Sequence, residues 1–449
     1  MITNRKAEVI LVNAEKIFWT HIDVNLLKKR FQENGFDLLM LKELDQDSCL
    51  NQRIQNDLNP KEIYRGIKLY NVCLYNICNE LGIFKNELCV DDHYEVISKW
   101  YYLAKKTIDY LEKIFIEKKV LGAIVFHGHL LFDACLLAVC KLYRVRFLTL
   151  EITSNKNRLV WDNLSGYVVS YNLARNYFYK HIDDNIDEKI DSYSKEYLTR
   201  IDSYKSYEHA SIVDDRSILI FQDQPFALYL CQVYNDASQL FTFENSLVNP
   251  VDVINEASRI SKSLGINLVI KIHPKEIVGK NPVTRKSYNQ LTFNRIKYLE
   301  SEKHIFIDKN NEFNTYELIK KSVAVITVNS QAGLEAALYN KPVLSYYKGF
   351  YSGLGFTNDY SDLKDLELKL KFIVKNDIKK NKNLLAAQSF FYTFNEHYCI
   401  QKSEISLFEK IVEVFYLEKS VLFKMYNSIR KATYPLRRKF IKITSFWKE

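Results

Sequence analysis

The chain has 449 residues, which is too long for one compact core because single cores stop growing at roughly 250–300 residues. Hydrophobic residues make up 47% and charged residues 26% of it, which excludes a disordered or fibrous protein and predicts two globular domains. The net charge of +9 is concentrated in the segment 419–449, where nine Lys or Arg stand against one Glu. The nearly neutral remainder argues against an extended nucleic-acid groove, and we expect no nucleic-acid partner.

The cysteines and the hydropathy pattern indicate the cellular compartment in which the protein is expected. Eight cysteines are scattered without a CxxC pair or a spacing that suits zinc, so we expect reduced core thiols. No stretch approaches 18 uninterrupted apolar residues, and the N-terminus lacks an adequate signal-peptide core. We therefore expect a cytoplasmic protein without a membrane-spanning helix.

The first half of the chain contains a strand at 8–12, a long helix at 94–119 and then a strand–helix–strand unit. The unit consists of the strand 120–126, the helix 130–143 and the strand 146–151. Such a unit belongs to a parallel sheet whose ligand-binding loops lie at the carboxyl ends of the strands. His127 and Glu151 stand at two of these ends.

The segment 183–215 is polar and charged, and we expect the domain linker there. Strands and helices alternate after it, which predicts a second, doubly wound α/β domain. The expected strands are 217–222, 267–272, 304–307, 324–328 and 342–345, and the expected helices are 249–264, 315–321 and 331–339. The predicted domains are a first α/β domain at 1–205, a second α/β domain at 212–375, and 376–449 as C-terminal helices with a basic, aromatic tail.

Two elements of the second domain suit an anionic ligand. Lys271 and His273 follow an apolar strand, where they can neutralise charge on a phosphate. About 55 residues later, Asn329 and Ser330 stand between a strand and a helix whose free N–H groups favour an anion. Gly333 would let a ligand approach the backbone, while Glu335, expected in the first turn, could bind sugar hydroxyls. Capping by Ser330 and a favourable first-turn charge at Glu335 are the structural alternatives.

Lys271-x-His273-Pro274, followed by Asn329-Ser330-x-x-Gly333-Leu-Glu335, resembles the capsule polysaccharide biosynthesis family, which includes Kdo transferases. The segment 220–224 resembles a strand of that family that ends in Gln. The resemblance implies a GT-B fold, in which two Rossmann-like domains face each other across a cleft, with 1–205 on the acceptor side and 212–375 for the nucleotide sugar. It also implies an inverting transfer from CMP-Kdo that needs neither a metal nor a cofactor. The donor-binding residues that we predict are Gln222, Gln224, Lys271, His273, Asn329, Ser330, Gln331, Gly333 and Glu335, with His273 and Ser330 at the donor phosphate.

An inverting transfer needs a general base near the acceptor hydroxyl. We favour Glu151, with His127 as an acceptor contact or alternate base, and count His273 among the catalytic residues because it would neutralise the leaving phosphate. A purely structural, hydrogen-bonded role for His127 carries equal weight. The pair His127 and His129 could suggest a metal, but no third ligand has a suitable spacing.

The segment 420–449 mixes aromatic and basic residues, which suits an interfacial segment on anionic lipid. We therefore expect a nucleotide sugar, a lipid-linked or oligosaccharide acceptor and the inner membrane surface as partners. A helix that packs back on the first domain is the alternative for this segment. Alternative functions are a sugar-nucleotide epimerase, a CDP-polyol phosphotransferase and a non-catalytic membrane-associated assembly protein.

Overall fold

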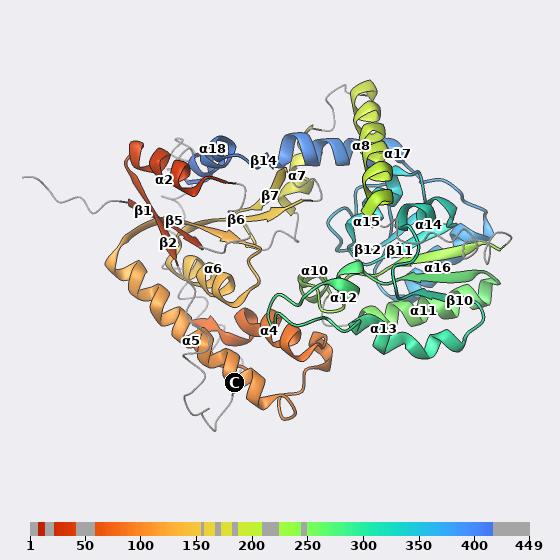
Figure 1. The fold of residues 1–449 in the computed structure, drawn as a ribbon, viewed down its shortest axis with the longest axis horizontal. Helices are drawn as coiled ribbons and strands as arrows, with labels where there is room; N and C mark the ends of the chain where they lie inside the picture. Colours follow the sequence, from red (N-terminus) through yellow and green to blue (C-terminus); the bar gives the residue numbers. More distant parts are fainter. Residues whose placement is uncertain are drawn as a thin grey trace, which may run out of the picture.

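The computed structural model describes residues 8–13, 22–41, 59–153, 157–166, 172–181, 187–208, 224–243 and 249–415. Two six-stranded sheets form the cores of two lobes, which lie on the left and on the right of Figure 1. The predicted strand at 217–222 and the basic tail after residue 415 lie outside the described residues. Among the described helices, none is long and apolar enough to span a bilayer.

The first sheet has the strand order β14-β7-β6-β5-β1-β2. Strands β2, β1, β5 and β6 are parallel, whereas at one edge β7 pairs antiparallel with β6, and β14 pairs antiparallel with β7. The strands are β1 (Glu8–Asn13), β2 (Phe36–Leu41), β5 (Lys119–Phe126), β6 (Arg146–Ile152), β7 (Arg158–Asp162) and β14 (Ile400–Gln401). The predicted strand–helix–strand unit is present as β5, α6 (Leu131–Tyr143) and β6.

Helices cover both faces of this sheet, which explains why β1 is apolar along its length. Val9 and Leu11 pack in the cluster that includes α4 (Leu69–Leu81), α5 (Tyr94–Glu117) and α6. Ile10 and Val12 pack on the other face against α2 (Val24–Glu33) and α18 (Glu404–Phe415). The chain thus returns from the second lobe through β14 and α18 to complete the first.

The second sheet is parallel throughout, with the order β10-β9-β8-β11-β12-β13. In chain order this is the Rossmann arrangement 3-2-1-4-5-6, whose direction reverses between β8 and β11. Its strands are β8 (Phe226–Leu230), β9 (Asn267–Lys271), β10 (Ile305–Asp308), β11 (Ala324–Thr327), β12 (Val343–Tyr346) and β13 (Asn358–Tyr360). Since both lobes are Rossmann-like, the predicted GT-B architecture is confirmed.

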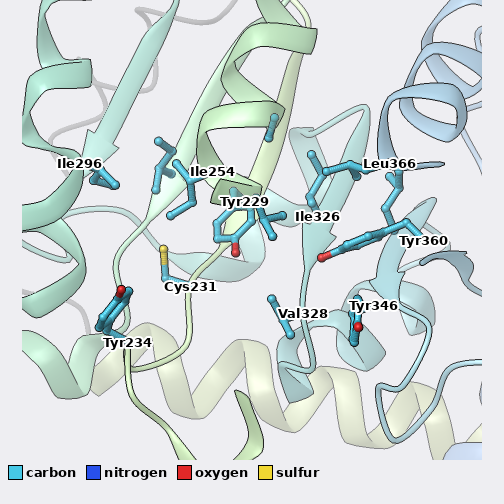
Figure 2. Close-up of a cluster of buried hydrophobic side chains, with 14 of the residues drawn as sticks. Tyr229, Cys231, Tyr234, Ile254, Ile296, Ile326, Val328, Tyr346, Tyr360 and Leu366 are labelled. Atoms are coloured by element: carbon cyan, nitrogen blue, oxygen red, sulfur yellow. The ribbon is translucent and has the colours of Figure 1, made fainter. Parts of the chain in front are cut away.

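Helices also cover both faces of the second sheet. One face packs against α11 (Pro250–Leu264), α13 (Leu291–Ile296) and α16 (Leu363–Lys375), and Figure 2 shows part of this core. The other packs against α8 (Asp187–Glu208), α14 (Thr315–Lys321), α15 (Gln331–Leu338) and α17 (Leu384–Tyr392). The N-cap Asn249 of α11 accepts the backbone N–H groups of Val251 and Asp252, which fits the helix start predicted at 249.

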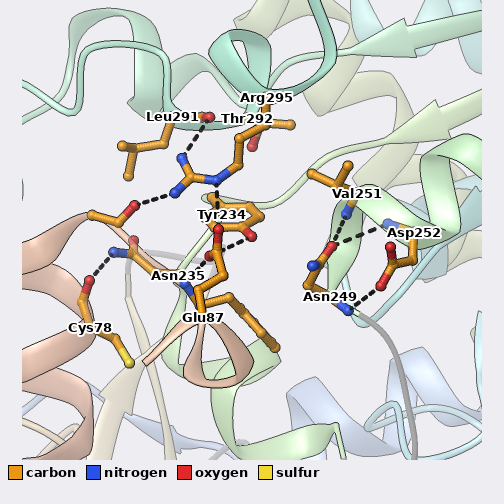
Figure 3. Close-up of polar contacts among 12 residues, drawn as sticks. Cys78, Glu87, Tyr234, Asn235, Asn249, Val251, Asp252, Leu291, Thr292 and Arg295 are labelled. Carbon is orange, nitrogen blue, oxygen red and sulfur yellow. Dashed lines mark hydrogen bonds and ion pairs between the residues drawn. The ribbon is translucent and has the colours of Figure 1, made fainter. Parts of the chain in front are cut away.

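Helix α4 belongs to both cores and joins the lobes. Its Cys73 and Ile77 pack with α5 and α6, while Tyr75 and Cys78 pack with the second sheet's core. Polar contacts also stabilise this junction: Asn235 Nδ2 donates a hydrogen bond of 2.9 Å to the Cys78 carbonyl (Figure 3). The two lobes are therefore connected by buried apolar and polar contacts together.

Candidate active site in the cleft between the sheets

The carboxyl ends of β8, β9 and β11 surround a cavity of about 310 Å³ at the point where the strand order reverses. In open α/β sheets ligands bind at this position. The lining residues from the predicted set are Lys271, His273, Ser330, Gln331 and Glu335. Segments that are separate in the sequence therefore meet at one site.

Ser330 caps the amino end of α15, where its Oγ accepts the backbone N–H of Ala332 at 3.3 Å. The preceding Asn329 is 4% exposed, and its Oδ1 accepts the backbone N–H of Phe350 at 2.7 Å. Its Nδ2 is buried and has no hydrogen-bond partner among the described residues. The α15 amino terminus thus combines a capped helix start with an unsatisfied donor at the cleft, which suits an oxyanion.

His273 lies at the rim of the same cavity as the N-cap of the short helix α12 (Pro274–Val278). Its Nδ1 accepts the backbone N–H of Lys275 at 3.1 Å. An accepting Nδ1 means that the neutral imidazole carries its proton on Nε2. The ring can therefore offer one N–H donor while it is held at the end of β9.

Lys271 differs from the prediction, because the structure buries its ammonium in a structural network. The side chain is 3% exposed and pairs with Asp308 of β10. Its Nζ also donates to Asn311 Oδ1 at 2.6 Å and to the Phe313 carbonyl at 2.7 Å. Burial lowers the pKa of Lys271, which Asp308 partly offsets. These three bonds occupy its donors, so Lys271 supports the cavity wall rather than meeting a donor phosphate.

The structure also corrects the predicted role of Gly333. A Cβ at this position would lie 2.1 Å from the hydroxyl oxygen of Tyr351 and 2.7 Å from Thr327 Cγ2. The glycine is therefore required by the packing of α15 against its own domain. It does not serve a close approach of ligand to the backbone.

Glu335 lies in the second turn of α15, one residue beyond the first turn in which it was expected. It is 3% exposed, and its two oxygens accept the hydroxyl groups of Tyr197 at 2.9 Å and Tyr316 at 2.8 Å. The carboxylate lines the floor of the cavity. Each carboxylate oxygen already accepts one hydrogen bond, so a ligand hydroxyl would have to bind an oxygen that also accepts a tyrosine hydroxyl.

Of the two predicted glutamines, the structure describes only Gln224. Gln222 lies outside the described residues. Gln224 precedes β8 at the amino end of the sheet, where its Oε1 accepts Asn267 Nδ2 at 3.0 Å, so it is remote from the carboxyl edge. The glutamine that does follow the strand is Gln232, whose Oε1 accepts the backbone N–H of Asn329 at 3.0 Å. The sequence interpretation missed it because it predicted no strand at β8 (Phe226–Leu230).

Asp236 was also missed. It caps α10 (Ala237–Thr242) by accepting the backbone N–H of Ser238 at 2.8 Å, and it lines the cavity beside Gln232. The sequence did contain a local signal for this helix start, because an Asp before a run of small and polar residues is typical of an N-cap. Its helix is short, and the predicted elements included no helix at this place.

Glu276 fixes the loops that carry these residues. It is fully buried, and its Oε1 accepts the backbone N–H of Tyr234 at 2.6 Å and the hydroxyl of Thr292 at 2.8 Å. Its Oε2 accepts the backbone N–H of Thr292 at 2.7 Å. Burial raises the pKa of Glu276, against the effect of these three donors. The carboxylate thereby ties the loop of Gln232 and Asp236 to the helix that begins after His273.

The carboxyl edge of the first sheet faces this site with His127 and Glu151. His127 has a left-handed backbone (φ 59°), and its N–H donates to the Leu150 carbonyl at 3.0 Å. Its Nδ1 lies 3.6 Å from Glu151 Oε1 and has no hydrogen bond within the described residues. Glu151 is about one-third exposed. The structure thus brings the predicted base and its alternate together at the end of β6.

His129 completes this group and remains neutral. Its ring centroid lies 4.3 Å from that of Tyr75 and 5.3 Å from that of His127. Desolvation, with a smaller contribution from the charge of His127, lowers the pKa of His129 to about 3. In the part of the chain that the structure describes, no group of three His, Cys, Asp or Glu residues could hold a metal ion.

A second cavity, of about 170 Å³, connects the two edges. Glu151 and Thr153 line it from the first sheet, and Asn329 and Gln331 line it from the second. Gln232, Asp236 and Gln331 line both cavities. The two cavities therefore adjoin at these three residues, with the α15 amino terminus on one side and the Glu151 carboxylate on the other.

These features define a GT-B α/β protein with an anion site and a carboxylate across one cleft. Residues 166–385 match the family model described as capsule polysaccharide biosynthesis protein. This match covers 220 of the 449 residues and agrees with the resemblance of the motifs to the capsule polysaccharide biosynthesis family.

Comparisons with solved structures give likenesses at low sequence identity. The β-Kdo 2,4 transferase KpsC of Thermosulfurimonas dismutans is 17% identical, with a TM-score of 0.42, over 65% of this chain and 88% of that chain. The UDP-GlcNAc 2-epimerase of Neisseria meningitidis is 11% identical, with a TM-score of 0.31, over 91% and 99%. A search of curated proteins finds no match.

Proposed function

We propose that the protein is an inverting glycosyltransferase of capsule or other surface polysaccharide biosynthesis, with a nucleotide sugar as donor and a lipid-linked or glycan acceptor. One observation carries this proposal: a single cavity is lined by Glu151 from the first lobe and by Asn329 and Gln331 from the second. This geometry supports a donor phosphate and an acceptor hydroxyl on opposite sides of one reacting carbon. The match to the capsule polysaccharide biosynthesis family model supports the polysaccharide pathway.

In the proposed reaction, the acceptor hydroxyl oxygen attacks the anomeric carbon while Glu151 takes its proton. The bond between that carbon and the phosphate oxygen breaks, and the nucleotide leaves with the electron pair. Backbone N–H groups at the start of α15, the Ser330 hydroxyl and the His273 imidazole meet the charge that develops on the phosphate. Attack from the face opposite the leaving group inverts the configuration.

CMP-Kdo is the donor that the motif resemblance favours. A thermal-shift comparison of CMP, CDP and UDP with the full chain tests the nucleotide, because a ligand that binds only the native state raises its apparent stability. We expect stabilisation by the cytidine nucleotides and none by UDP. Stabilisation by UDP alone would contradict the CMP-Kdo assignment while leaving the transferase proposal intact.

Product analysis tests the transfer itself. We expect a new glycosidic product only when the donor and an acceptor glycan are both present, at the same rate with and without EDTA, since the proposed reaction uses no metal or cofactor. Conversion of the donor into an epimeric nucleotide sugar without an acceptor would contradict the transferase proposal. Loss of transfer in EDTA would contradict metal independence.

The tail 420–449 is proposed to place the reaction at the membrane surface. Its basic and aromatic residues support peripheral attachment to the inner face of the cell membrane, near a lipid-linked acceptor. Deletion of 420–449 should shift the protein from the membrane fraction to the soluble fraction. An unchanged membrane fraction would contradict a role of the tail in attachment.

A further inference from the structure

The outer face of α16 exposes two large apolar side chains one helical turn apart. Leu368 is 68% exposed and Phe372 is 61% exposed. The inward face of the same helix already buries Leu366, Leu370 and Ile373 against the second lobe's core. The outward pair therefore adds nothing to the packing of its own domain, and it leaves two neighbouring apolar side chains in contact with solvent.

Lysines accompany this pair on the same face. At about 100° per residue, Lys364, Lys371 and Lys375 fall within the arc of the helix surface next to Leu368 and Phe372. The segment 363–385 contains seven lysines and three acids, a net charge of +4. We call this face, made of Lys364, Leu368, Lys371, Phe372 and Lys375, the α16 face.

The acids of the segment are already paired. Asp365 binds Lys369, Glu367 binds Lys371 and also Arg259 of α11, and Asp377 binds Lys379. Within the described residues, Lys364, Lys375, Lys380 and Lys382 have no ion-pair partner. The α16 face thus presents uncompensated positive charge around exposed apolar side chains.

We propose that the α16 face docks on an anionic lipid bilayer, as an attachment surface distinct from the C-terminal tail. A bilayer surface offers both an apolar layer and negative charge, because acyl chains can contact Leu368 and Phe372 while anionic headgroups bind the lysines. The long lysine stems can lie along the apolar layer with their ammonium groups at headgroup level.

A second copy of the chain is a poorer occupant. A twofold dimer would place the same face on both sides of the interface, and its lysines would oppose the lysines of the partner. The repulsion would be strongest where the apolar pairs would have to meet. The charge pattern therefore favours lipid over self-association.

The test is co-flotation of the full-length protein with vesicles of phosphatidylcholine containing one-third phosphatidylglycerol, and with vesicles of phosphatidylcholine alone. We expect binding to the anionic vesicles only, weakened by added salt. The variant Leu368→Ser/Phe372→Ser should bind about fivefold more weakly, and Lys364→Glu/Lys375→Glu about tenfold more weakly. The matched control on the first lobe, Lys106→Glu/Ile116→Ser, should bind like the wild type, since Ile116 is 72% exposed on α5.

All these variants retain the tail, so a difference between them reports on the α16 face alone. Equal vesicle binding by the wild type and both α16 variants would overturn the proposal, as would failure of the wild type to bind anionic vesicles. A wild-type dimer that the α16 variants convert to a monomer, with vesicle binding unchanged, would also overturn it and assign the face to self-association. None of these outcomes depends on the transfer reaction, so they are distinguishable from failure of the proposed function.

Discussion

The carboxyl edges of the two sheets meet at one cleft, but their polar groups are satisfied differently. On the second sheet, Asn329 is bonded to Phe350 and to Gln232, and the buried Glu276 fixes the neighbouring loops. On the first sheet, His127 Nδ1 has no hydrogen bond within the described residues and lies 3.6 Å from a partly exposed Glu151. The second edge is held by bonds to its own loops and leaves one buried donor, Asn329 Nδ2, without a partner among the described residues, which suits an oxyanion. The first edge leaves an unbonded ring nitrogen beside a partly exposed carboxylate, which suits proton transfer.

The largest expected effect tests the first edge. Glu151→Gln keeps the shape of the side chain but removes the base, and we expect the transfer rate at saturating donor to fall about a thousandfold. Stabilisation by the bound nucleotide should not change, because the donor phosphate is proposed to bind on the other sheet. A rate within tenfold of the wild type would mean that Glu151 is not the base.

The next effect tests the second edge. His273→Ala and Ser330→Ala should each reduce transfer about a hundredfold and weaken nucleotide binding, since each removes a group that meets the leaving phosphate. Ser330→Ala also removes a helix cap, which costs about 1 kcal/mol of stability. Asn249→Ala is the matched control, because it removes the cap of α11 away from the cleft. Equal activity losses in Ser330→Ala and Asn249→Ala would assign Ser330 a structural role alone.

A smaller effect separates packing from ligand binding at the second edge. Gly333→Ala should lower the free energy of unfolding by about 2 kcal/mol, because the new Cβ overlaps the Tyr351 hydroxyl. Addition of Tyr351→Phe should recover part of this loss, so that the double variant is more stable than the sum of the two single changes predicts. Chemical denaturation of the four proteins measures this coupling. Strictly additive losses would contradict the overlap.

An effect of similar size concerns pH at the first edge. The pKa of His129 is about 3 in the folded protein, against an ordinary 6.5, so the unfolded chain takes up the proton first as the pH falls. The stability associated with neutral His129 is present above pH 6.5 and decreases below it, and we expect a loss of about 2 kcal/mol by pH 5. His129→Gln should lose less stability than the wild type between pH 7 and pH 5. Parallel pH profiles would show that His129 is not buried as a neutral ring.

Local signals in the sequence predicted much of the fold. The apolar runs of β5, β6, β9 and β11, the start of α11 and the cap of α15 were found because each depends on neighbouring residues. Short or irregular elements such as β7, β13 and β14 were missed, since their stability comes from pairing with distant strands. Helix α18, which precedes the tail, likewise gains its apolar contacts from β1 and α2, which are nearly the whole chain length away in sequence.

The candidate site divides in the same way. The sequence alone determined that Lys271, His273, Asn329 and Ser330 lie at or just after the ends of two strands of one α/β domain, because strand ends and helix caps are local. Only the tertiary structure decided that Lys271 is held by Asp308, a residue on the neighbouring strand β10. It also decided that Gly333 accommodates Tyr351 and that Gln232 and Asp236 join the cleft. The physical reason is that burial and partners are set by chain segments distant in sequence, which no local pattern records.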